Sequence, residues 1–140
     1  MKTIATVGGL GFCPIAPGTV GSAVGLGIAW ILSGSGMQQA IGCLVAIGLA
    51  LWSAGPTAKA MGDADPRPVI IDEVAGMMVA LAALPVRWPV YLAAFVLFRF
   101  LDVVKPPPIR RIESLPGSVG IVGDDLVAGL VTNVMVRVLL

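Results

Sequence analysis

Ionisable side chains gather in three short stretches of an otherwise apolar chain of 140 residues. Seven of them share this arrangement: Asp72 and Glu73; Arg99, Asp102 and Lys105; Asp124 and Asp125. Five carboxylates and two cations give these clusters a formal charge of −3, so the group requires a cation. All of the available ligands are hard oxygens, and this favours magnesium, or manganese in its place, over zinc or copper. Carboxylate-bound metal beside basic groups is suited to chemistry on phosphate.

Several other phosphatase chemistries are excluded by residue type. The chain has no His, which rules out a Ser-His triad and histidine phosphatases. Cys13 and Cys43 lack an Arg at the spacing of a cysteine phosphatase, and there is no phosphate-binding GxxxxGK[ST] loop. The Asp63-Ala64-Asp65 triplet resembles the paired acids of haloacid dehalogenase-type phosphatases, but it lies in a Gly- and Pro-rich loop, so we interpret it as a solvated turn.

Structural alternatives exist for some of these residues. Arg99 and Asp102 are spaced i, i+3 and could form only a salt bridge on one helix face. Asp124 could cap the amino end of the last helix. Adjacent acids point about 100° apart on a helix, so we expect at most one of each neighbouring pair to face a given metal.

The composition indicates a membrane protein. Hydrophobic residues make up 57% of the chain and charged residues 12%, and the mean hydropathy is +0.97. A soluble domain needs more polar surface than this, whereas a bilayer supplies an apolar solvent. The net charge is only +1 and there is no basic run, which argues against nucleic-acid binding.

Breaks rich in Gly and Pro divide the chain into apolar segments, and their lengths predict an all-α, compact multihelical membrane protein with a single domain over residues 1–140. We predict about five helical segments: 18–33, 37–57, 69–84, 89–104 and 122–140. Several are shorter than the roughly 20 residues that cross a bilayer, so some would be half-buried or re-entrant. Gly21, Gly25 and Gly27 fit close packing between helices.

The positions of Lys and Arg predict the orientation. If Lys2 is cytoplasmic, so are five further basic residues: Lys59, Arg67, Lys105, Arg110 and Arg111. Only Arg87 lies in an outward connection, while Arg137 near the far end agrees less well. In this topology the polar helix ends converge at the cytoplasmic face, together with Thr19 at the start of the first segment.

Four ordered motifs carry a family resemblance: GFCPIAPGTVGS at 11–22, IDEVAG at 71–76, FRFLDVVKPPPIR at 98–110 and GIVGDDLVAG at 120–129. The chain resembles the phosphatidylglycerophosphatase A family, bacterial magnesium-dependent membrane phosphatases with a multihelical fold. The resemblance implies hydrolysis of phosphatidylglycerophosphate to phosphatidylglycerol and inorganic phosphate, a step in phospholipid synthesis. It also implies an integral protein of the bacterial inner membrane with its active site at the cytoplasmic face.

Resemblance and charge together predict the site residues. Catalytic roles are expected for Asp72, Asp102 and Asp125, binding of Mg²⁺ for Glu73, Asp124 and Asp102, and binding of substrate phosphate for Thr19, Arg99, Lys105 and Arg110. Asp72 or Asp125 would be the base that activates water, while a carboxylate nucleophile forming an aspartyl phosphate remains open. Arg110 and Arg111 have a second interpretation as anchors to anionic headgroups.

Two other classes of function compete with a phosphatase. In a transporter or channel subunit, the polar cluster would be part of an ion pathway, and polar groups would then follow the whole membrane depth. A non-catalytic assembly protein would need neither a metal nor the Arg99, Asp102 and Lys105 group.

Overall fold

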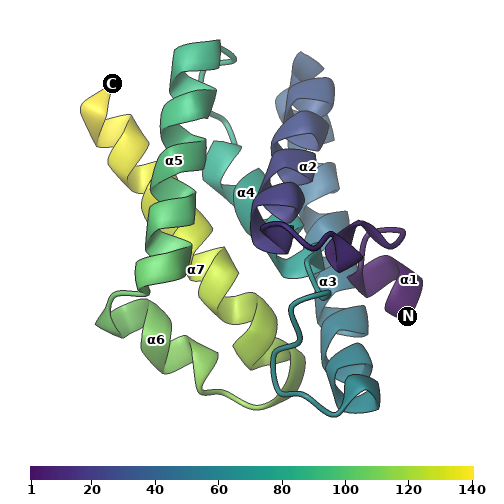
Figure 1. Ribbon diagram of the computed structural model, residues 1–140. Coiled ribbons are helices and arrows are strands. Elements are labelled where there is room, and N and C mark those ends of the chain that lie inside the picture. The colour runs from purple at the N-terminus through teal and green to yellow at the C-terminus, as the bar shows by residue number, and fades with distance from the viewer.

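The computed structural model describes all residues from 1 to 140 and contains α-helices, two short 3-10 helices and no strands (Figure 1). The α-helices are α1 (Lys2–Ala5), α2 (Pro17–Ile31), α3 (Gly36–Met61), α4 (Ile71–Leu81), α5 (Trp88–Val104), α6 (Pro107–Glu113) and α7 (Gly117–Leu139). The 3-10 helices are η1 (Leu10–Phe12) and η2 (Leu32–Gly34). The all-α class predicted from the sequence is confirmed.

The predicted count of about five segments is too low, because the chain forms seven α-helices. The five longer helices correspond to the five apolar segments, whereas α1 and α6 were not predicted. Pro107 at the first position of α6 lacks an N–H where a helix needs none, so the proline run starts a helix as well as ending α5. Helix α7 also begins earlier than expected, at Gly117.

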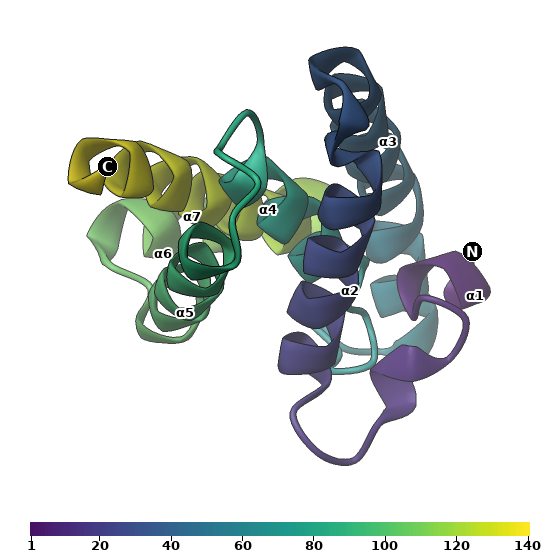
Figure 2. The same cartoon turned by 90° about the horizontal axis from the view of Figure 1, so that it is seen from above.

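Helix α4 lies at the centre of the molecule and packs against α7, α2 and α3 (Figure 2). Nine of its eleven residues are buried. Viewed from above, α2 and α3 lie on one side of it, and α5 and α7 lie on the other. The helix that carries Asp72 and Glu73 is therefore shielded by the four longest helices.

Glycines allow the backbones to approach closely around α4. A Cβ on Gly129 of α7 would overlap the carbonyl group of Gly76 on α4, and a Cβ on Gly25 of α2 would lie 2.6 Å from the Val74 carbonyl oxygen. Gly21 also packs tightly, against Ile70. Close packing is thus confirmed for Gly21 and Gly25 but wrong for Gly27, which faces open space.

Three helical stretches are long and apolar enough to cross a membrane: Pro17–Gly34, Gly36–Met61 and Gly117–Leu139. Helix α5 has 17 residues, and α4 has only 11, a length of about 16 Å. Helix α4 is therefore too short to span the hydrocarbon of a bilayer, which is about 30 Å thick.

Side chains of α7 bind the carboxyl end of α4. The Nδ2 atom of Asn133 donates hydrogen bonds to the carbonyl oxygens of Ala80 at 3.0 Å and Ala82 at 2.8 Å. Arg137 Nη2 donates to the same Ala82 oxygen at 3.0 Å, and its Nε donates to Asn133 Oδ1. These donors satisfy carbonyls that a helix end leaves free, and they give Arg137 a partner within the protein.

Candidate active site

Helices α4, α5 and α7 bring the acidic residues together. Asp72 and Glu73 lie in the first turn of α4, where the helix dipole favours negative charge. Asp102 lies in the last turn of α5, and the Asp124-Asp125 pair lies in the amino-terminal half of α7. The sequence-distant clusters therefore meet in space, as the helix order predicted.

Oxygen atoms of these acids form two overlapping groups that could hold a metal ion. The first contains Asp72, Glu73 and Asp125, and the second contains Asp102, Asp124 and Asp125. Within each group the ligand atoms lie within 4.8 Å of one another. Asp125 belongs to both groups and is only 2% exposed.

Both neighbouring pairs contribute two residues to one group, so the expectation of one acid per metal is wrong. The Cβ atoms of adjacent residues do point about 100° apart. The groups lie between helices rather than over one helix, however, and the side-chain torsions of the acids let both carboxylates reach the same space. The structure also separates Glu73 and Asp124, which were predicted to share a metal, into different groups.

Three oxygens of the first group have no hydrogen-bond partner. Asp72 Oδ1, Glu73 Oε2 and Asp125 Oδ1 are all buried and unpaired. Unpaired buried carboxylate oxygens are costly, so native proteins pair such atoms or coordinate a cation with them. Three hard oxygens in this arrangement suit a hard divalent cation, so the residues present could hold a metal ion.

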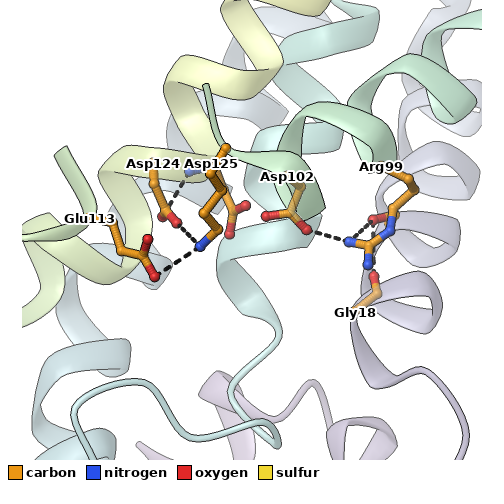
Figure 3. A network of polar contacts seen from close by, with 8 residues as sticks. Gly18, Arg99, Asp102, Glu113, Asp124 and Asp125 are labelled. Atoms are coloured by element: carbon orange, nitrogen blue, oxygen red, sulfur yellow. Dashed lines mark hydrogen bonds and ion pairs between the residues drawn. The ribbon is translucent and has the colours of Figure 1, made fainter. Parts of the chain in front are cut away.

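Arg99 connects the acids to the start of α2 (Figure 3). It forms an ion pair with Asp102, and its Nη1 donates a hydrogen bond to Ser22 Oγ at 3.5 Å. A Cβ on Gly18 would lie 2.9 Å from Arg99 Nη2, so the missing side chain lets the start of α2 lie close to the guanidinium. The salt bridge between Arg99 and Asp102, left open above, is present.

Lys105 binds two acids on the other side of the cluster, Asp124 and Glu113, which Figure 3 labels. Its Nζ donates to Asp124 Oδ2 at 2.7 Å and forms an ion pair with Glu113 Oε1 at 3.1 Å. Although partial burial acts to lower the pKa of Lys105, these two carboxylates raise it above its ordinary value, so the amine stays charged. Asp124 lies two turns inside α7, so the alternative that it caps this helix is wrong.

Two predicted phosphate-binding residues lie apart from this network. Thr19 is exposed in the first turn of α2, next to Gly18. Arg110 is exposed on α6 and forms no ion pair. Its neighbour Arg111 is also exposed and also forms no ion pair.

A small pocket of about 240 Å³ opens beside the acids, and we call it the arginine pocket. Its polar lining residues are Asp65, Arg67, Glu73 and Arg99, and Gly18 forms part of its wall. A larger cavity of about 1000 Å³ borders the same loop and includes Lys59, Asp65 and Glu113. The arginine pocket lies closer to the acidic groups than the larger cavity does, since Glu73 and Arg99 line it.

Sequence reasoning missed Asp65, Arg67 and Glu113. The solvated turn predicted for Asp65 is confirmed, since this residue is exposed in a bend, but its position at the border of both cavities was not predicted. The flanking Pro66 and Pro68 were a signal that the position of Arg67 is fixed. No pattern pointed to Glu113, because its contact with Lys105 depends on the short helix α6.

The chain is similar to known proteins over most of its length. The family model for phosphatidylglycerophosphatase A matches residues 3–140. The chain is 38% identical to the phosphatidylglycerophosphatase A of Escherichia coli, with 89% of the chain and 74% of the relative covered. It is also 38% identical to that of Haemophilus influenzae, with 91% and 81% covered.

A third relative, from Bacteroides thetaiotaomicron, carries the provisional name phosphatidylinositol-3-phosphatase. It is 35% identical, with 96% of the chain and 90% of the relative covered. No solved structure matches the chain significantly. The family match over nearly the whole length, together with relatives of this identity and coverage, shows that the chain belongs to the phosphatidylglycerophosphatase A family.

Proposed function

We propose that this protein hydrolyses phosphatidylglycerophosphate to phosphatidylglycerol and inorganic phosphate. The family and two relatives named for this activity support the reaction. The single observation that carries it is the set of three buried, unpaired carboxylate oxygens beside an arginine pocket. Such a set calls for a cation, and the pocket offers positive charge for a phosphate.

Magnesium is the proposed cofactor. Asp72, Glu73 and Asp125 would hold it, because their free oxygens form the first acidic group. Asp102 and Asp124 would support the same site through the second group, which shares Asp125. When bound, Mg²⁺ would polarise the phosphoryl group and offset the negative charge of the acids.

The basic residues have separate tasks in this proposal. Arg99 holds Asp102 through Nη1, while its Nη2 donates no hydrogen bond within the chain and is free to bind phosphate oxygens as charge develops on them. Lys105 positions Asp124. Asp102 Oδ2 is bound to Arg99, which leaves Oδ1 to accept a proton from the attacking water.

The bonds and protons of the reaction balance as follows. The water oxygen forms a bond to phosphorus and gives a proton to Asp102, the phosphorus–oxygen bond to the glycerol breaks, and the departing glycerol oxygen takes up that proton. A carboxylate nucleophile with an aspartyl phosphate is the other route, and it would regenerate the same carboxylate with water.

We propose the cytoplasmic face of the bacterial inner membrane as the location of the site. Lys59, Arg67, Lys105, Arg110 and Arg111 all lie at the same end of the molecule as the acids or in the connections there. Cytoplasmic connections are rich in Lys and Arg. The bilayer would then surround the apolar helices, and its inner leaflet would supply the lipid substrate.

A second substrate class receives support from one relative. The Bacteroides thetaiotaomicron protein is named for a phosphoinositide, and the cavity of about 1000 Å³ next to Glu113 has space for a larger headgroup. Phosphatidylinositol 3-phosphate therefore belongs in the same assay as an alternative substrate.

The decisive test is phosphate release by detergent-purified protein with Mg²⁺ and with chelator. We expect magnesium-dependent release from phosphatidylglycerophosphate, and a loss of at least about 100-fold in Asp125→Asn, because this carboxylate serves both acidic groups. The matched control is Asp63→Asn, which removes one exposed negative charge at the same end of the molecule. Thermal unfolding would verify that both variants fold.

Metal binding can be measured without turnover. Electron paramagnetic resonance with Mn²⁺ should detect binding to the native chain and to Asp63→Asn, and much weaker binding to Asp125→Asn. Folded native protein that releases no phosphate from either lipid with any divalent metal would refute the proposed function.

A further inference from the structure

Arg67 is the one cation in the arginine pocket without a partner in the protein. Arg99, the other arginine there, is paired with Asp102 and Ser22. Arg67 forms no ion pair and no side-chain hydrogen bond. An arginine that lines a pocket with all its donors free is available to bind an anion from outside the chain.

The loop around Arg67 is held in place. Pro66 before it is buried, and the Val69 amide donates to the Pro66 carbonyl at 3.0 Å. The Ile70 amide donates to the Ala5 carbonyl at 2.9 Å, which ties the loop to α1. On the other side, a Cβ on Gly11 would overlap the carbonyl of Pro68, the residue after Arg67. Arg67 therefore extends from a fixed backbone, and this reduces the entropy that binding would cost.

Other groups in the pocket also lack partners. Helix α2 begins at Pro17 without a side-chain cap, so the amides of Gly18 and Thr19 have no acceptor in the chain. Glu73 Oε2, in the same pocket, is buried and unpaired. The pocket thus combines free amide donors and free guanidinium donors with Glu73, a member of the first acidic group.

The charges of the proposed substrate explain two arginines in one pocket. Phosphatidylglycerophosphate carries a terminal phosphate monoester and, one glycerol away, a phosphodiester with its own negative charge. Five carboxylates surround the place where the monoester must react, so a second anion nearby needs its own cation. Lys105 is already bound to Asp124 and Glu113, and Arg110 and Arg111 do not line the pocket, so Arg67 is the free cation within it.

We propose, as an extension of the proposed function, that Arg67 binds the phosphodiester of the lipid headgroup while Arg99 binds the terminal phosphate. Arg67 is then a specificity-determining residue, because it distinguishes a headgroup with two phosphates from a lipid with one. The pocket of about 240 Å³ accommodates this compact headgroup and leaves the acyl chains outside in the bilayer.

The two reaction products, phosphatidylglycerol and inorganic phosphate, can be used to test the Arg67 and Arg99 contacts separately. Phosphatidylglycerol contains the phosphodiester without the monoester, and inorganic phosphate stands in for the monoester alone. In neutral detergent micelles, we expect both to inhibit the native enzyme competitively. Arg67→Gln should raise the inhibition constant of phosphatidylglycerol at least about tenfold, since hydrogen bonds between charged groups are lost, and leave that of inorganic phosphate within twofold.

Arg87→Gln is the matched control, because Arg87 is exposed like Arg67 and the variant removes the same charge from the α4–α5 connection, outside the pocket. Arg67→Lys keeps the charge but loses the planar guanidinium. Its inhibition constant for phosphatidylglycerol should therefore lie between those of Arg67→Gln and the native chain. The proposal is overturned if the two inhibition constants rise together, if neither changes, or if phosphatidylglycerol does not inhibit the native enzyme. A native chain that releases no phosphate would refute the proposed function instead.

Discussion

Asp125 shows how much of the site depends on one side chain. It contributes to both acidic groups, is almost fully buried, and keeps one oxygen without a hydrogen bond. Arg99 and Lys105 are each paired with a different acid, Asp102 and Asp124, so neither neutralises Asp125. The charge at Asp125 is therefore the part of the cluster that most needs the metal.

Asp65 gives the cluster a pH-dependent stability. Partial desolvation raises its pKa to about 6, and three nearby carboxylates add to this rise: Asp72, Glu113 and Asp102. Lys105 acts in the opposite direction. Because the folded-state pKa is above the ordinary value of 3.8, ionisation of Asp65 destabilises the fold, with no effect below about pH 4 and the full effect above about pH 6.

In metal-free protein, we therefore expect Asp65→Asn to gain stability relative to the native chain as the pH rises from 4 to 6.5. Thermal unfolding in detergent with chelator would measure this difference. Asp63→Asn, in the same loop, is the control. A difference between Asp65→Asn and the native chain that is the same at every pH would contradict this explanation.

The residue types of the site were predictable from the sequence, but their grouping was not. Charge and hard-oxygen chemistry pointed to Asp72, Glu73, Asp102, Asp124 and Asp125, and the helix order brought them to one end. Which oxygens share a metal depends on side-chain torsions and on the crossing of α4 with α7. Arg67 was counted only for orientation, because no spacing rule connects that loop with Arg99.

At the scale of elements, the crossing of α4 and α7 sets the distance between the acids. Gly129 and Gly76 touch at this crossing, one turn beyond Asp125 and Asp72 respectively. The sequence predicted the long helices well, because apolar runs between Gly and Pro breaks are a strong signal. It missed α6, which has seven residues and no apolar run.

We expect Gly129→Ala to push α4 away from α7, because the added methyl group would overlap the Gly76 carbonyl. Overpacking of this kind costs about 1–3 kcal/mol and would also separate Asp72 from Asp125. The temperature of thermal unfolding should fall, and the affinity for Mn²⁺ should decrease. Gly48→Ala on α3, where the new methyl group meets open space, is the control: it should leave Mn²⁺ binding unchanged and should not lower the unfolding temperature, because Ala favours a helix more than Gly does. Normal Mn²⁺ binding by a well-folded Gly129→Ala would argue against this role for the crossing.

For the whole molecule, three helices can cross a membrane by length and composition, and one end holds the acids. The side of the membrane on which this end lies is testable with thiol labelling. In a chain without Cys13 and Cys43, we expect an impermeant thiol reagent added to intact bacteria to label Val86→Cys in the α4–α5 connection. Ser114→Cys, between α6 and α7, should react only after lysis. The reverse pattern would place the site outside the cytoplasm.

The attachment of α4 to α7 also bears on how the protein is made. Helix α4 is synthesised before α7, yet the carbonyls of Ala80 and Ala82 at its carboxyl end accept hydrogen bonds from Asn133 and Arg137 of α7. During synthesis, the short α4 therefore has unsatisfied carbonyls at one end and two acids at the other, and lipid is a poor solvent for both. These two carbonyls therefore gain their side-chain donors only with the last helix, which is also the helix that brings Asp124 and Asp125 to the acidic groups.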